Sequence, residues 1–294
     1  MSRLSSPQAV FAVVGFGVFI AADDLTVAST MLRQIIDDLH IALPEGFDDA
    51  AWIVNAYLIA YVAVMPFAGR LSDVWGRRRV FIGALSVFAL GSAWLSVTTS
   101  LGPFLIARVL TAIGGGAMVP VALAVVGDLF TAERRGHGFG GLAAIDTLGW
   151  VWGPLFGALL VRFLDWRWQF YLNVPMALIG IALAFVSLRG VGKPSHRSLD
   201  LPGAFAMSVA LIALTMGLLE SAELATSADL AGLTAGGGPP AWPLFIVAAV
   251  AVGYLLIRHR RSFAPPRIFA SYPPSRAMFR PTLGGNAACP LGRR

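Results

Sequence analysis

The chain of 294 residues is 57% hydrophobic and only 13% charged, a composition that excludes an ordinary soluble domain. Its formal net charge of +6 would suit a nucleic-acid-binding protein, but most of its basic residues lie in short gaps between long apolar runs. We therefore expect no nucleic-acid partner, and we expect a lipid bilayer to surround the chain. The single cysteine, Cys289, permits no intrachain disulfide.

Eight apolar runs follow one another along the sequence, most of them long enough to cross a bilayer as a helix. They comprise residues 8–32, 50–68, 80–97, 102–126, 139–160, 170–188, 201–219 and 242–257. Because hydrocarbon offers no partner for a free backbone amide, the fold is predicted to be all-α and integral to the membrane, with about eight transmembrane helices. The apolar pattern resumes at Leu25, so we expect no cleaved signal peptide.

The distribution of lysine and arginine predicts the orientation of the chain. With the N-terminus in the cytoplasm, the short cytoplasmic segments would hold Arg3, Arg70, Arg77, Arg78, Arg79, Arg134, Arg135, Arg189, Lys193 and Arg197. The opposite loops would hold only Arg33, Arg162 and Arg167. This excess of positive charge predicts a multi-pass protein of the plasma (inner) membrane with a cytoplasmic N-terminus.

Two acidic residues, Asp23 and Asp24, lie near the middle of the first run, where an ionised carboxylate costs at least about 2.5 kcal/mol. Such a group should face a partner or a water-filled cavity, and adjacent residues of a helix point about 100° apart, so we do not expect both to share one cavity. The sequence Asp24-x-Thr26-Val27 resembles the first helix of the 14-helix drug:proton antiporter branch of the major facilitator superfamily. The resemblance implies that Asp24, more than Asp23, couples to protons or contacts substrate; a structural hydrogen-bond hub is the alternative.

The polar sequence from Gly69 to Arg79 separates the second and third runs. Gly69 and Gly76 suit a tight reversal between two helices. Asp73, the only acid of this stretch, can accept hydrogen bonds from the neighbouring arginines or from the start of the next helix. The pattern Gly-x-Leu-x-Asp-x-x-Gly-Arg-Arg resembles the loop between helices 2 and 3 of the same superfamily. The resemblance implies a cytoplasmic gate closing against a second half of the transporter; a positively charged loop with no further role is the alternative. The gate residues would be Gly69, Asp73, Gly76, Arg77 and Arg78.

An arginine, Arg108, lies inside the fourth run, about one turn from its outer end. A buried guanidinium needs an acceptor, and Asp24 or Asp23 is available; snorkelling toward the outer interface is the alternative. The sequence Leu105-x-x-Arg108-x-x-Thr111-Ala112-x-Gly114 resembles the helix-4 motif of the superfamily, although Thr111 and Ala112 depart from it. The resemblance implicates Arg108 in proton transfer.

The fifth run carries Gly149-x-x-x-Gly153-Pro154-x-x-Gly157, in which glycines four apart form a smooth stripe for a neighbouring helix. We expect Pro154 to bend this helix. The sequence resembles the helix-5 motif of the antiporters, so it favours export; packing alone is the alternative. Asp146, one turn earlier, is an additional acid that would line the cavity or bond to Thr147 and the nearby backbone.

The resemblance covers about residues 9–267 and divides the chain into three parts. It implies a six-helix transporter half over residues 8–188, two additional helices with their loops over residues 189–257, and a basic disordered tail over residues 258–294. Transporters of this superfamily rock two six-helix halves about a central site. We therefore expect the chain to be truncated, with the missing C-terminal half or self-association completing the transporter.

We predict secondary active transport, with proton-coupled export of small organic compounds or drugs. A membrane interaction or regulatory protein that does not transport, or an inactive fragment, is the alternative, and import is a third. No Walker-type phosphate loop and no His-Glu-x-x-His motif is present, and the four histidines lack ligand spacing. We therefore expect no enzymatic activity, no metal and no cofactor.

Overall fold

A computed structural model of the chain describes residues 6–42, 46–192, 200–230 and 241–262. Contacts between residues separate two units, Met1–Leu255 and Leu256–Arg294. In the second unit only residues 256–262 are described, and they continue the last helix. Residues 258–262, predicted to begin the tail, therefore belong to a helix, and the rest of the predicted tail lies outside the described residues.

The described residues form eight α-helices and their connections, with no strand among them. The helices are α1 (Pro7–Asp38), α2 (Phe47–Trp75), α3 (Arg77–Leu95), α4 (Leu101–Leu129), α5 (Arg135–Phe163), α6 (Arg167–Ser187), α7 (Leu201–Leu230) and α8 (Trp242–Ser262). Seven described helices are long and apolar enough to cross a membrane, and the apolar helix Trp242–Arg258 is shorter than these. The predicted all-helical membrane fold is confirmed.

Several helices extend beyond the apolar runs that predicted them. The first, α1, has 32 residues, or about 48 Å of helix, whereas the hydrocarbon core of a bilayer is only about 30 Å thick. Its N-cap is Ser6, whose hydroxyl accepts a hydrogen bond of 3.2 Å from the backbone amide of Ala9, and Pro7 occupies the first turn. Its polar ends therefore project beyond the apolar segment.

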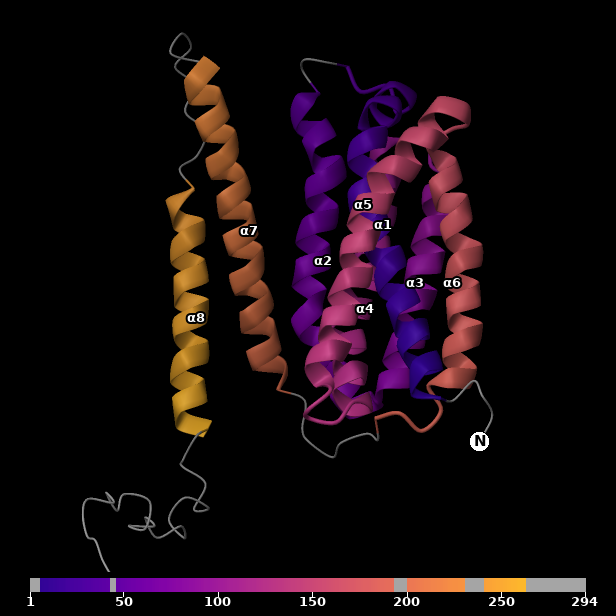
Figure 1. Ribbon diagram of the computed structural model, residues 1–294. Coiled ribbons are helices and arrows are strands. Elements are labelled where there is room, and N and C mark those ends of the chain that lie inside the picture. The colour runs from indigo at the N-terminus through magenta and orange to yellow at the C-terminus, as the bar shows by residue number, and fades with distance from the viewer. Residues whose placement is uncertain (1–5, 43–45, 193–199, 231–240, 263–294) are drawn as a thin grey trace, which may run out of the picture. The chain divides into compact units, whose positions relative to one another are not determined.

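The first six helices form a bundle in which α1 and α4 occupy central positions (Figure 1). α1 packs against α4, α5 and α6, while α4 also packs against α2 and α3. Consequently both helices bury much of their surface, and side chains near their midpoints meet inside the bundle. Asp23 and Asp24 on α1 and Arg108 on α4 are among the buried residues.

Close approach of α4 to its neighbours depends on glycine. A Cβ atom at Gly114 would lie 2.5 Å from the backbone nitrogen of Phe88 on α3, and one at Gly116 would lie 2.8 Å from Val64 Cγ1 on α2. Both distances are shorter than ordinary van der Waals contact, so these glycines let the backbones approach in the way that small residues allow between membrane helices.

The seventh helix, α7, packs against α2. The Ser208 hydroxyl donates a hydrogen bond of 2.7 Å to the backbone carbonyl of Ala63. This bond joins the N-terminal half of α7 to the middle of α2.

Candidate functional site

The centre of the bundle holds an ion pair between α1 and α4. Arg108 NH1 lies 3.0 Å from Asp24 Oδ2, and the two side chains are 1% and 0% exposed. Arg108 is the eighth residue of α4, about two turns from its start. Its guanidinium therefore points inward rather than snorkelling, with its carbon 4.2 Å from the centre of the Tyr57 ring on α2.

Two polar residues of α6 join the adjacent acids into one network. Asn173 Nδ2 donates a hydrogen bond of 3.0 Å to Asp24 Oδ1, and Gln169 Nε2 donates one of 2.7 Å to Asp23 Oδ2. Gln169 Nε2 also lies 3.3 Å from Asn173 Oδ1. The expectation that Asp23 and Asp24 would not share one site is therefore wrong, because two amides one turn apart on α6 reach both of them. We call Asp23, Asp24, Arg108, Gln169 and Asn173 the buried cluster.

The buried cluster contains two carboxyl groups and one guanidinium group, and every one of its side chains is at most 4% exposed. Within the described part of the chain, Asp23 Oδ1, Gln169 Oε1 and Arg108 Nε have no hydrogen-bond partner, nor has the Tyr57 hydroxyl. The cluster thus has spare acceptors as well as more acidic than basic groups. Such a site can bind a proton.

Gln169, Asn173 and Tyr57 were not among the candidate residues predicted from the sequence. Gln169 and Asn173 are four residues apart, so a helix places them on one face, and this spacing was the available signal. Nothing in the sequence indicated that Tyr57 lies beside a guanidinium.

Asp146 lies on α5 and is only partly buried. No hydrogen bond or ion pair within the described residues joins it to the buried cluster. The neighbouring Thr147 hydroxyl instead donates a hydrogen bond of 2.9 Å to the backbone carbonyl of Ala143. Asp146 is therefore not a member of the buried cluster.

The glycines of the α5 motif lie against α1, next to the acidic residues. A Cβ atom at Gly149 would lie 2.7 Å from Ala22 Cβ, and one at Gly153 would lie 2.9 Å from the backbone oxygen of Asp23. A Cβ atom at Gly157 would lie 2.8 Å from Val27 Cγ2. α5 remains one helix through Pro154. The stripe therefore supports the backbone that carries Asp23.

Gly153→Ala should destabilise the protein by about 1–3 kcal/mol, because the added methyl group overlaps Thr26 and the backbone of Asp23. Unfolding of the purified chain in detergent, followed by circular dichroism, measures the change. Gly140→Ala on the same helix is the matched control, since a Cβ atom there meets nothing within 4 Å. Equal stability of the two variants would contradict this account of the stripe.

The connection between α2 and α3 consists of one residue, Gly76, which has a φ of 92°. This conformation favours glycine, as predicted. Gly69, in contrast, lies within α2, so the prediction that it forms part of the reversal is wrong. The polar sequence continues the helix for six more residues after Gly69, as far as Trp75, instead of breaking it.

Arg77, the first residue of α3, has its partners within this part of the chain. It forms an ion pair with Asp73, and its Nε lies 3.1 Å from Asp128 Oδ2 on α4. Its NH1 also donates a hydrogen bond of 2.6 Å to the Ser72 hydroxyl. The prediction that Asp73 accepts from a neighbouring arginine is therefore confirmed, and the gate against a second half stays a prediction.

Arg78 contacts a different helix. Its NH2 donates a hydrogen bond of 2.8 Å to the backbone carbonyl of Phe185 on α6, and its guanidinium carbon lies 4.3 Å from the centre of the Phe185 ring. Arg77 and Arg78 consequently tie α3 to α4 and to α6 at one end of the bundle.

The sequence of the chain matches a known protein family and several of its members. The sequence profile of the Major Facilitator Superfamily matches residues 14–264. Multidrug resistance protein 3 of Bacillus subtilis is 33% identical over 210 residues, which are 71% of this chain and 40% of that protein. A triacylglyceride transporter of Mycobacteroides abscessus is 33% identical over 240 residues, which are 81% of this chain and 44% of that protein.

Solved structures agree on the fold. The xylose transporter XylE of E. coli, in a partially occluded inward-open conformation, matches with a TM-score of 0.56 at 20% sequence identity, over 76% of this chain and 60% of that one. The chain spans less than half the length of the two curated relatives described above. The matched family and its transporter relatives point to a transporter rather than an enzyme. The chain belongs to the Major Facilitator Superfamily.

Proposed function

We propose that the chain forms the proton-binding half of a secondary transporter that exports small organic compounds, with the buried cluster as its proton site. The charges inside this cluster carry the proposal. Two ionised carboxylates beside one guanidinium leave one uncompensated negative charge among side chains that are at most 4% exposed. An uncompensated buried charge is costly, and one bound proton removes it.

The contacts of the two acids suggest which of them holds the proton. Asp24 receives a charged hydrogen bond from Arg108 and a second bond from Asn173, which together stabilise its ionised form. Asp23 receives one hydrogen bond, from the neutral amide of Gln169. We infer that the proton resides on Asp23 while Asp24 stays paired with Arg108.

This arrangement supports alternation between two states of the transporter. With the proton bound, the cluster is neutral and the bundle can stay closed around it; with the proton lost, the negative charge favours access to water or to a substrate. Proton entry from outside would then drive release of a compound to the outside, as in antiport. The α5 glycine motif resembles that of the antiporters and favours this direction over import.

The family works with two six-helix halves about a central site. We propose that a second half completes the cavity here, supplied by another polypeptide or by a second copy of this chain. The name of the Bacillus relative supports drugs as substrates, and that of the Mycobacteroides relative supports a lipid. We place the protein in the plasma membrane with its N-terminus in the cytoplasm, as the lysine and arginine distribution predicts.

Proteoliposomes that contain the 294-residue chain test the proposal. After a proton gradient is imposed, a panel of organic dyes and drugs is added and the internal pH is followed with a trapped indicator. We expect at least one compound to dissipate the gradient faster than in protein-free vesicles. If none does so, while the reconstituted chain is fully helical, a second copy of this chain does not complete the transporter. Failure again after the chain is reconstituted together with the C-terminal half of a relative would overturn the proposal and favour a membrane interaction protein.

A further inference from the structure

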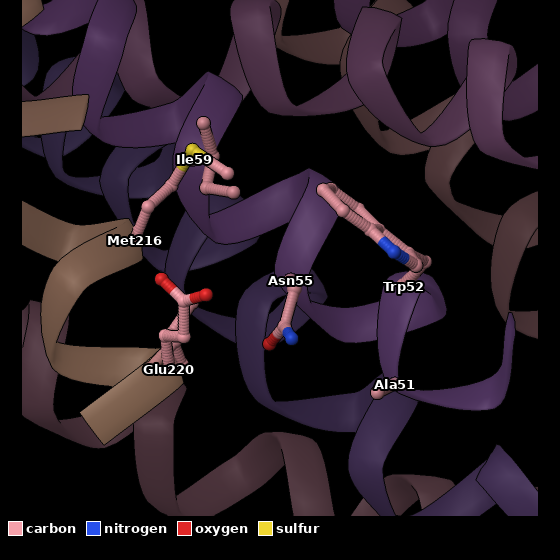
Figure 2. A pocket seen from close by; sticks show the side chains of 7 residues that line it. Ala51, Trp52, Asn55, Ile59, Met216 and Glu220 are labelled. Carbon is pink, nitrogen blue, oxygen red and sulfur yellow. The ribbon is translucent and has the colours of Figure 1, made fainter. Parts of the chain in front are cut away.

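A pocket of ≈ 280 Å³ lies between α2 and α7 (Figure 2). Met216 and Glu220 extend from α7, and Asn55 and Ile59 extend from α2, into the space between the two helices. The full lining comprises Ala51, Trp52, Asn55, Ile59, Met216, Leu219 and Glu220. None of these residues belongs to the buried cluster, so the pocket is a separate feature of the molecule.

The lining combines one acidic side chain with several apolar ones. Glu220 closes the apolar segment Pro202–Glu220, and its carboxylate shares the pocket with the side chains of Ile59, Met216 and Leu219. Within the described residues, no hydrogen bond or ion pair engages Glu220 or Asn55. An acid in such a setting marks a site for a cationic partner, because its charge is costly near hydrocarbon when left alone.

We propose that this pocket binds the ammonium head of an amphiphilic organic cation that reaches it from the bilayer. The Glu220 carboxylate supplies the opposite charge, and the Asn55 amide oxygen accepts a hydrogen bond from the ammonium group. The Trp52 indole, 43% exposed, offers the aromatic face that attracts cations best. Ile59, Met216 and Leu219 contact the start of the apolar tail.

The size of the pocket agrees with this occupant. Sites for drug-sized ligands usually enclose about 300–1,000 Å³, so a pocket of ≈ 280 Å³ holds a small head group while the rest of the ligand stays in lipid. The inference goes beyond the proposed function, since binding here requires neither transport nor the buried cluster.

Photolabelling in nanodiscs tests the pocket. The full chain is placed in phosphatidylglycerol nanodiscs, because this lipid carries no ammonium group, and is labelled with a diazirine derivative of dodecylammonium. We expect labelled peptides from α2 and α7, and at least about fivefold weaker labelling of these peptides in Glu220→Gln, which removes one charge and keeps the shape. Trp52→Leu should weaken labelling less, and Glu220→Asp should retain most of it.

Three controls make the outcome decisive. Asp146→Asn removes another partly buried acid from α5 and should leave the labelling of α2 and α7 unchanged. A neutral dodecanol probe with the same diazirine should label wild type and Glu220→Gln alike. Equal labelling of wild type and Glu220→Gln by the cationic probe, with unchanged helicity, overturns the proposal. Suppression of the label by a small fraction of phosphatidylethanolamine also overturns it, because the occupant would then be the bilayer's own lipid.

Discussion

Arg108→Met should destabilise the chain by about 3–5 kcal/mol, the largest loss of stability that we expect from any single substitution. The unbranched, uncharged methionine side chain leaves Asp24 buried without its cationic partner, beside a second acid at Asp23. It also removes the contact of the guanidinium with the Tyr57 ring. Equilibrium unfolding in mixed detergent, followed by circular dichroism, measures the difference from wild type.

Arg162→Met is the matched control for this prediction. Arg162 lies on α5 with an exposed side chain whose described contact is with the neighbouring Phe163 ring, so its replacement should change stability by no more than about 0.5 kcal/mol. Adding Asp24→Asn to Arg108→Met should recover part of the loss, because it removes the unpaired charge. If the two methionine variants were equally stable, the ion pair would not hold the bundle together.

Much of the helical architecture could be predicted from the sequence, because a bilayer allows few alternatives. A long apolar run has to be a helix in hydrocarbon, and all eight predicted runs lie within or almost within the observed helices. Their ends were harder to predict. Outside the hydrocarbon a helix continues as long as its own hydrogen bonds and caps permit, so Ser72 and Asp73 extend α2 although the apolar run ends at residue 68.

The sequence predicted a site residue only where an unpaired charge in lipid would have a large free-energy cost. Asp24 and Arg108 were both too costly to leave in lipid unpaired, and the structure brings them together. That Asp23 belongs to the buried cluster could not be predicted. Its side chain and that of Asp24 point about 100° apart on α1, and the sequence does not indicate that another helix contacts both. Gln169 and Asn173 supply that second helix. The contact between Arg77 and Asp128 depends likewise on packing between α3 and α4.

The glycines of the α2–α3 connection and of the α5 motif have different structural roles. Gly76 is needed for its positive φ, whereas Gly149 and Gly153 are needed for the distance between two helices. Gly69 has neither role, since it is helical and a Cβ atom there would lie 3.7 Å from Pro120 Cβ, an ordinary contact. Gly69 and Gly76 therefore belong to one sequence motif, but only Gly76 has a conformation that requires glycine.

Asp23→Asn should abolish proton coupling while leaving the stability of the chain nearly unchanged. Without the Asp23 charge, Asp24 and Arg108 balance each other, so the buried cluster no longer needs a proton. Asparagine keeps the shape of the side chain and can still accept a hydrogen bond from Gln169. In proteoliposomes, the decay of the proton gradient on addition of a transported compound should fall to the rate of protein-free vesicles.

Asp24→Asn provides the contrast that separates proton binding from structural support. It also neutralises one acid, so coupling should be lost, but it breaks the ion pair with Arg108 and should lower stability by more than about 1 kcal/mol. Asp146→Asn, outside the cluster, should keep both coupling and stability. Retention of wild-type gradient decay by Asp23→Asn would show that Asp23 does not carry the proton. The excess of one negative charge in the cluster would then have to be balanced in another way, and the proposed mechanism would be wrong.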